Sequence, residues 1–143
     1  MEMKYKSKSA EQTELIGKEF GAKLKKGDLV AFYGELGVGK TAFIKGIMLS
    51  LDLNAEVLSP TYSIVNEYRC EAKKLVVYHF DMYRIETFES LYSTGFFDYI
   101  DGNSIVLTEW TENIEAFLPD VNYKVSIKGM GEEERYISIE TKI

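Results

Sequence analysis

Residues 34–41 of the chain read Gly34-Glu35-Leu36-Gly37-Val38-Gly39-Lys40-Thr41, a glycine followed by four residues of any type and then Gly-Lys-Thr. Because glycine makes up about 7% of residues, this pattern arises by chance in a chain of this length with a probability of about 1%. A plain glycine-rich turn would not require lysine and threonine at the last two positions. The run therefore predicts a phosphate-binding loop.

The chemistry of phosphate binding explains the residue types in this loop. Glycines let backbone N–H groups turn inward around an anion with no side chain in the way. Lys40 is expected to reach the β- and γ-phosphates of a nucleotide, and Thr41 to offer its hydroxyl to Mg²⁺. We assign nucleotide contacts to Gly34, Glu35, Leu36, Gly37, Val38, Gly39, Lys40, Thr41 and Ala42.

The segments on either side of the loop have the periodicity that such a site needs. Leu29 to Tyr33 is a continuous apolar run, which is typical of a buried central strand. The apolar residues of 40–51 fall on one helical face. A capping box that starts at Ser9 and an apolar residue at every fourth position predict another helix over residues 9–25.

The rest of the chain alternates short strands and helices. The predicted elements are strands at 64–69, 74–80 and 104–109, a short helix at 86–94, a helical turn at 112–117, and two closing strands on either side of Gly129-Met130-Gly131. We predict a single domain over residues 1–143 with a three-layer α/β fold of the P-loop NTPase type. Its mixed central sheet should carry helices on both faces.

Composition limits the function classes. The chain has 143 residues, a net charge of −6 and one cysteine. So acidic a chain is a poor match for the phosphate backbone of a nucleic acid, and we therefore expect any nucleic-acid role to be indirect. The lone Cys70 excludes an intramolecular disulfide, and no apolar run approaches the ~20 residues of a membrane span. We expect a cytoplasmic protein with no membrane association.

Two acidic residues are candidates for the metal site that a P-loop hydrolase requires. Asp81 and Glu109 each follow an apolar predicted strand, and ligands of open α/β sheets bind where strands end. Either carboxylate could hold Mg²⁺, or could instead cap a strand end or open a turn. We assign Thr41, Asp81 and Glu109 to the metal, and we name Lys40, Asp81 and Glu109 as catalytic. The sequence does not separate the roles of the two carboxylates.

Three further residues have more than one interpretation. Thr61 follows the loop by about twenty residues, where it could sense the γ-phosphate as a switch residue or belong to a plain turn; we assign it to the nucleotide. His79 is either a hydrogen-bonded structural residue or part of a polar strand face with Asp81. Arg84 is either a charge-stabilising residue or the partner of a structural ion pair.

Taken together, four motifs resemble those of the bacterial TsaE family, also called YjeE. They are the loop at 34–41, Ser59-Pro60-Thr61-Tyr62, His79-Phe80-Asp81-Met82-Tyr83-Arg84 and Glu109-Trp110. They occur in the family's order and spacing over nearly the whole chain, and Arg135 also resembles a family position. Two departures are Ala42, where a second threonine often stands, and Thr111, where a proline often follows the Glu-Trp pair. Neither departure removes a charged or phosphate-binding group.

The resemblance implies a P-loop ATPase that takes part in making threonylcarbamoyladenosine beside the anticodon of tRNA, together with the proteins TsaB and TsaD. The acidic charge agrees with a role that reaches tRNA indirectly, through these partner proteins. ATP or ADP and Mg²⁺ are the implied cofactors. It implies Mg²⁺ contacts at Thr41, Asp81 and Glu109, and nucleotide contacts at Ser9, Thr13 and Trp110.

Other functions share the same loop. A small-molecule kinase would use it, although the chain contains no arginine-rich lid segment. A GTPase is disfavoured because neither Asn-Lys-any-Asp nor Thr-Lys-any-Asp occurs in the sequence. A non-catalytic, nucleotide-dependent adaptor would bind ATP without releasing phosphate. We predict an ATPase with slow intrinsic hydrolysis, since no arginine finger can be assigned.

Overall fold

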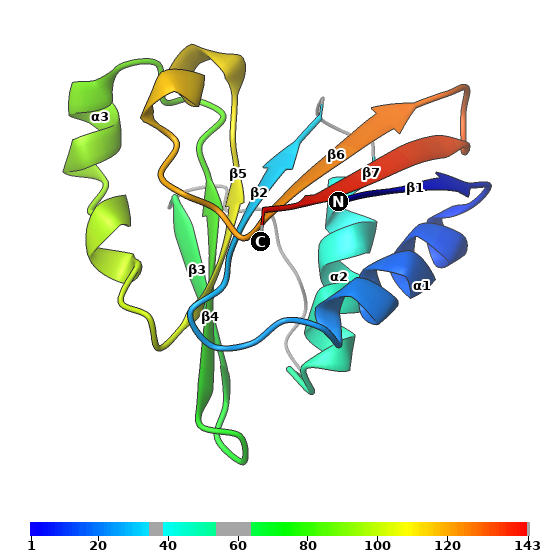
Figure 1. Cartoon of the computed structure of the whole chain (residues 1–143), viewed down its shortest axis with the longest axis horizontal. Coiled ribbons are helices and arrows are strands. Elements are labelled where there is room, and N and C mark those ends of the chain that lie inside the picture. Colours follow the sequence, from blue (N-terminus) through cyan, green and yellow to red (C-terminus); the bar gives the residue numbers. More distant parts are fainter. Residues whose placement is uncertain (35–38, 54–63, 143) are drawn as a thin grey trace.

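The computed structural model describes residues 1–34, 39–53 and 64–142, which form one seven-stranded sheet flanked by helices (Figure 1). The strands are β1 (Glu2–Ser7), β2 (Leu29–Tyr33), β3 (Val65–Cys70), β4 (Leu75–Asp81), β5 (Ile105–Glu109), β6 (Tyr123–Gly129) and β7 (Arg135–Thr141). The helices are α1 (Ala10–Gly21), α2 (Lys40–Ser50) and α3 (Phe88–Ser93), with the 3₁₀ helices η1 (Phe96–Tyr99) and η2 (Glu112–Phe117). None of the helices within these ranges is both long and apolar enough to cross a membrane.

The sheet is mixed, with the order β1-β7-β6-β2-β5-β4-β3. β2 pairs in parallel with β5 and β6, and β4 pairs in parallel with β5. The pairs β1–β7, β6–β7 and β3–β4 are antiparallel. Because β2, β5 and β4 run in the same direction, their carboxyl ends lie at one edge of the sheet, where open α/β sheets bind their ligands.

Helices cover both faces of the sheet (Figure 1). Val30 and Phe32 of β2 belong to the hydrophobic cluster that includes α1 and α2, whereas Leu29 and Ala31 belong to the cluster that includes α3, η1 and η2. Successive residues of β2 are therefore buried on opposite faces, as its uninterrupted apolar run predicts. The predicted α/β fold with a mixed sheet and helices on both faces is confirmed.

Helices α1 and α2 touch through their backbones. A Cβ atom at Gly17 would lie 2.1 Å from the carbonyl oxygen of Phe43, and one at Gly46 would lie 2.0 Å from the carbonyl oxygen of Glu14. No side chain fits at such a separation, so glycine is required at both positions for the two helices to pack this closely.

The predicted first helix, residues 9–25, is too long at its C-terminal end. Ser9 does cap the helix, because its hydroxyl accepts a hydrogen bond from the N–H of Gln12. The α-helix ends at Gly21, and the chain continues through bonds between residues three apart, from Lys23 to Phe20 and from Leu24 to Gly21. Leu24 is nevertheless buried. The apolar repeat therefore predicted the burial of Leu24 correctly, but the predicted length of α1 was wrong.

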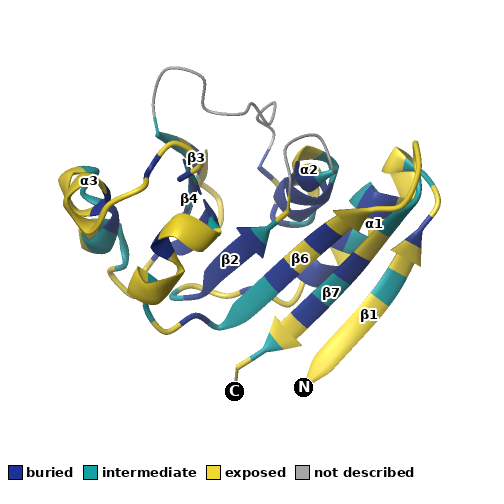
Figure 2. Ribbon diagram, turned by 90° about the horizontal axis from the view of Figure 1, so that it is seen from above, coloured by how far each residue is buried: buried dark blue, intermediate teal, exposed yellow. Residues whose placement is uncertain are grey.

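Two elements of the structure are absent from the sequence prediction, namely β1 and η1. β1 is the edge strand beside β7, and most of its residues are exposed (Figure 2). Lys4, Lys6 and Lys8 are exposed, and the first two of them belong to this strand. Charged side chains on an edge strand protect it from pairing with other chains.

Candidate functional site

The start of α2 is built to receive an anion. Gly39 precedes the helix with a φ of 98°, a left-handed conformation that favours glycine. Lys40 and Thr41 are the first two residues of the helix, so its unpaired N–H groups and the positive end of its dipole lie beside them. The first turn of α2 holds no acidic residue that would compete for these groups.

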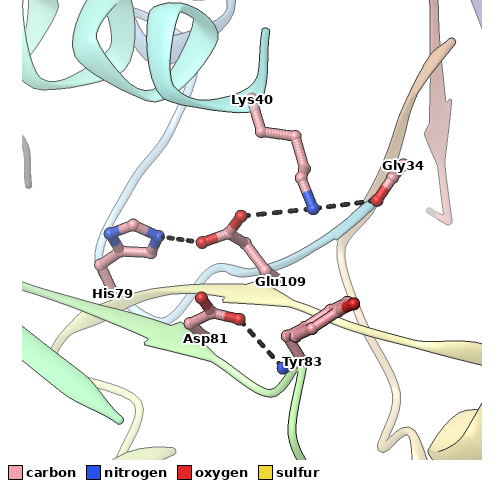
Figure 3. A network of polar contacts seen from close by, with 6 residues as sticks. All are labelled: Gly34, Lys40, His79, Asp81, Tyr83 and Glu109. Atoms are coloured by element: carbon pink, nitrogen blue, oxygen red, sulfur yellow. Dashed lines mark hydrogen bonds and ion pairs between the residues drawn. The ribbon is translucent and has the colours of Figure 1, made fainter. Parts of the chain in front are cut away.

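Lys40 joins the end of β2 to the end of β5 (Figure 3). Its Nζ donates a hydrogen bond of 2.9 Å to the carbonyl oxygen of Gly34 and lies 3.4 Å from Oε1 of Glu109. Only 9% of the Lys40 side chain and 10% of the Glu109 side chain are exposed. The stability of the fold depends on both members of a charged pair this deeply buried, because the loss of one leaves the other charge buried and unpaired.

His79 of β4 holds the other side of the Glu109 carboxylate. Its Nε2 lies 2.9 Å from Oε2 of Glu109, and Nε2 carries the proton of this bond because a carboxylate only accepts. Burial raises the pKa of the Glu109 carboxyl, but the hydrogen bond and the attraction from His79, followed by those from Lys40, outweigh it and leave that pKa below its ordinary value. Glu109 is therefore held as a carboxylate that faces Lys40.

Asp81 lies next to Glu109 but in different surroundings. The two are register partners in the parallel strands β4 and β5. Asp81 is half-buried, and its Oδ1 accepts a hydrogen bond of 2.9 Å from the backbone N–H of Tyr83 (Figure 3). Its second carboxylate oxygen makes no hydrogen bond within the described ranges, so Asp81 has capacity left for a ligand.

The donors at this edge of the sheet suit Mg²⁺. Thr41 is exposed at the start of α2, and Asp81 offers a carboxylate oxygen, whereas both oxygens of Glu109 are engaged by Lys40 and His79. The described part of the chain holds no cluster of three or more His, Cys, Asp or Glu side chains that could bind a metal by themselves. Mg²⁺ in nucleotide sites does not need such a cluster, because one or two protein ligands act together with phosphate oxygens and water.

A pocket of about 530 Å³ opens beside Lys40, which is within the range of small-molecule sites. It is lined by Ala10, Thr13, Gly39, Lys40, Thr41, Ala42, Lys45, Glu132, Glu133 and Arg135. One wall comes from α1 and α2, and the other from the segment between β6 and β7 together with the first residue of β7. Five of the residues predicted to contact nucleotide are therefore together on its surface.

Other predicted contact residues lie elsewhere. The Ser9 hydroxyl is engaged as the cap of α1. Trp110 is only 2% exposed, and its indole N–H donates to the carbonyl oxygen of Ile114, so it lies in the hydrophobic cluster below α3. Arg84 is exposed and forms no ion pair within the described residues. The predicted contacts Glu35, Leu36, Gly37, Val38 and Thr61 lie outside the described residues.

Sequence reasoning missed part of the pocket wall. Glu132 and Glu133 line it, and Arg135 donates hydrogen bonds to the carbonyl oxygens of Gly131, Glu132 and Glu134 and so supports that segment. Gly129-Met130-Gly131 indicates a turn, but its position opposite α1 depends on the pairing of β7 with β1, and β1 was not predicted.

Residues 7–137 of this chain match the family described as threonylcarbamoyl adenosine biosynthesis protein TsaE. The chain belongs to the TsaE family. Two relatives are both named tRNA threonylcarbamoyladenosine biosynthesis protein TsaE. The one from Bacillus subtilis strain 168 is 36% identical over 137 residues, which cover 96% of this chain and 84% of the relative. The one from Treponema pallidum strain Nichols is 31% identical over 137 residues, which cover 96% of this chain and 99% of the relative.

A solved structure agrees with this family assignment. The crystal structure of Bacillus subtilis YdiB has a TM-score of 0.77 to this chain at 31% sequence identity, and the match covers 99% of this chain and 86% of YdiB. The resemblance to the TsaE family that the sequence motifs indicate is therefore confirmed, and with it a place in the biosynthesis of threonylcarbamoyladenosine in tRNA.

Proposed function

We propose that this TsaE-family chain binds ATP with Mg²⁺ and hydrolyses it slowly while serving threonylcarbamoyladenosine modification of tRNA together with TsaB and TsaD. The observation that carries the proposal is the position of Lys40. It is the first residue of α2, it lines the pocket, and it is held between Gly34 and Glu109.

The residues at the start of α2 account for triphosphate binding. The N–H groups of its first turn and Lys40 offer positive potential to the phosphates, and the exposed Thr41 hydroxyl is free to ligate a metal. Bound Mg²⁺ would neutralise charge on the β- and γ-phosphates. Lys40 must exchange its contact with Glu109 for phosphate oxygens, so ATP competes with the carboxylate for this side chain.

Asp81 and Glu109 account for the hydrolytic step in different ways. Asp81, whose second carboxylate oxygen makes no hydrogen bond within the described residues, would accept a proton from the attacking water or orient it. Glu109 releases Lys40 to the phosphates and keeps its orientation through the bond to His79. Among the described residues, Arg135 is the one arginine that lines the pocket, and its guanidinium donates to the carbonyl oxygens of Gly131, Glu132 and Glu134, which favours slow hydrolysis without partners.

Net charge supports an indirect route to tRNA. The chain carries −6 overall, so it repels the RNA backbone, and TsaB and TsaD would supply the surface that holds tRNA. The TsaE-family chain would then act on its partners through the nucleotide that it binds and hydrolyses. It would not itself transfer the threonylcarbamoyl group.

The proposal is tested by measuring ATP affinity and phosphate release for the wild type, Lys40→Ala and Thr41→Ala, each alone and with TsaB and TsaD. We expect TsaB and TsaD to stimulate release, and both variants to lose the stimulated release by about 100-fold or more. Thr41 is exposed, so Thr41→Ala keeps the fold even if loss of the buried Lys40 does not. Lys23→Ala, an exposed lysine outside the site, is the matched control and should behave as the wild type.

Two other results would contradict the proposal and indicate a different function. If the phosphate of ATP appeared only on an added metabolite, the chain would be a kinase. If ATP bound tightly but no phosphate was released with TsaB and TsaD present, the chain would be a nucleotide-dependent adaptor.

A further inference from the structure

Four aromatic rings gather on the side of the sheet that α3 covers, opposite to α1 and α2 (Figure 1). The ring of Phe88 in α3 lies 5.1 Å from that of Phe117 in η2, 6.3 Å from that of Phe97 in η1 and 6.1 Å from that of Tyr92. Phe88 is 45% exposed, Tyr92 67% and Phe117 37%. We call these four residues the aromatic patch.

The aromatic patch is not explained by the core. The residues that fill the cluster below it, such as Leu91 and Phe96, are fully buried and belong to the same elements. Of the patch residues, Phe97 is half-buried and packs against this cluster. Phe88, Tyr92 and Phe117 are exposed and lie outside it, and Phe88 contacts the rings of the other three patch residues. Exposed apolar surface costs free energy in water, and contiguous exposed rings mark interaction sites more often than scattered ones do.

The aromatic patch also lies apart from the candidate nucleotide pocket. None of its four residues lines the pocket beside Lys40. The pocket opens between α1, α2 and the segment before β7, whereas α3 lies on the opposite face of the sheet (Figure 1). Nucleotide binding as proposed above therefore gives these rings no role.

The charge around the aromatic patch has one sign. From Ile85 to Tyr123 the chain contains eight Asp or Glu residues and no Lys or Arg, although the whole chain holds 17 Lys or Arg. This segment includes α3, η1 and η2. Glu115 is paired with Lys124, which follows the segment. The exposed carboxylates of Glu86, Glu89, Asp98 and Glu112 form no ion pair with any residue in the described part of the chain.

We propose that the aromatic patch and the acidic residues around it dock a protein partner whose surface has an apolar hollow rimmed by Lys and Arg. Interfaces of this kind place aromatic anchors at the centre, where they leave water, and complementary charges at the rim, where they steer association. An RNA strand does not fit, because its phosphates would be repelled by the acidic rim. The inference rests on the proposed function for the partner's identity, which is the TsaB–TsaD complex.

The test measures the affinity of the TsaB–TsaD complex for three double variants of the full chain, at low and at high salt. The aromatic variant, Phe88→Ser with Tyr92→Ser, removes two exposed rings. The rim variant, Glu89→Lys with Glu112→Lys, reverses the charge of two acidic residues beside the patch. The control, Glu71→Lys with Glu140→Lys, makes the same charge change at exposed positions outside the segment. Affinity for an ATP analogue and the thermal midpoint are measured for each, so that a folding defect is recognised.

We expect the aromatic variant to bind the complex about 30-fold more weakly than the wild type, the loss typical of a central anchor. The rim variant should bind about tenfold more weakly at low salt and lose most of its salt dependence, because rim charges act through long-range attraction. The control should stay within about twofold, and ATP-analogue affinity should not change in any of them.

The other outcomes overturn the inference in distinguishable ways. If the wild type binds the complex and both patch variants bind it equally well, the docking surface lies elsewhere and the proposed function stands. If the wild type does not bind the complex, the proposed function loses its partners and this inference falls with it. If the variants instead abolish a concentration-dependent self-association of the wild type, the patch joins two copies of this chain.

Discussion

The ends of β4 and β5 carry two acids of the same chemistry in opposite environments. Asp81 and Glu109 are register partners, yet the Glu109 side chain is 10% exposed and held by Lys40 and His79. Asp81 is half-buried, and within the described residues its carboxylate accepts a single hydrogen bond, from the backbone N–H of Tyr83. Position at a strand end therefore does not define the role of a carboxylate. The neighbouring groups define that role, because a carboxylate that is already paired resists a new ligand, whereas a carboxylate with an unused oxygen can bind one.

The largest difference between the two acids should appear in stability. Glu109→Ala leaves Lys40 buried with a single carbonyl partner, so we expect a loss of about 3–5 kcal/mol in the free energy of unfolding. Asp81→Ala removes one hydrogen bond at a half-exposed position, so we expect a loss of about 1 kcal/mol or less. Urea unfolding at neutral pH measures both.

Glu109→Gln is the matched control for this comparison. It keeps the shape and an acceptor for His79 but loses the charge that faces Lys40, so its stability should fall between those of the wild type and Glu109→Ala. Equal losses for Glu109→Ala and Asp81→Ala would show that the Lys40–Glu109 pair contributes nothing beyond an ordinary hydrogen bond.

The second difference should appear in catalysis, where we expect Asp81 to matter more than Glu109. Asp81→Asn keeps the fold and the hydrogen bond to Tyr83 but cannot accept a proton, so we expect phosphate release stimulated by TsaB and TsaD to fall about 100-fold. Its affinity for ATP without Mg²⁺ should match that of the wild type. Asp120→Asn, at an exposed position away from the site, should release phosphate normally. Wild-type release from Asp81→Asn would move the hydrolytic role to Glu109.

The smallest expected difference is in the response to acid. The pKa of Glu109 lies below its ordinary value of 4.5 in the folded chain, so the unfolded chain takes up the proton first as the pH falls. The stabilisation that Glu109 provides is complete above about pH 4.5 and is lost as the pH falls through the lower, folded pKa. The stability gap between the wild type and Glu109→Gln should be constant from pH 7 to 5 and shrink below pH 4.5 in urea titrations. A gap that widened on acidification would contradict the direction of this shift.

Local sequence patterns predicted most of the fold. Strand β2, helix α2 and the strands β3 and β4 lie within one or two residues of their predicted bounds. Each of these signals depends on residues close in sequence, where periodicity and turn chemistry act directly. The position of Asp81 and Glu109 at one sheet edge was also predictable, because both end apolar strands.

What the sequence did not predict depends on distant residues. β1 alternates charged residues with Met3 and Tyr5, but without its partner β7 nothing marks it as a strand. The pocket residues Glu132 and Glu133 reach α1 only through that pairing. Likewise, the pairing of Glu109 with His79 and Lys40, which separates its role from that of Asp81, joins side chains from two strands and a helix.

The backbone contact at Gly17 and Gly46 has a mechanical consequence. Helices packed that closely cannot slide past each other without a clash, so Thr13 of α1 and Lys40 of α2 move as parts of a single block. The pocket wall formed by α1 and α2 is therefore rigid. A change in the width of the pocket has to come from the opposite wall, the short segment between β6 and β7 that Arg135 supports.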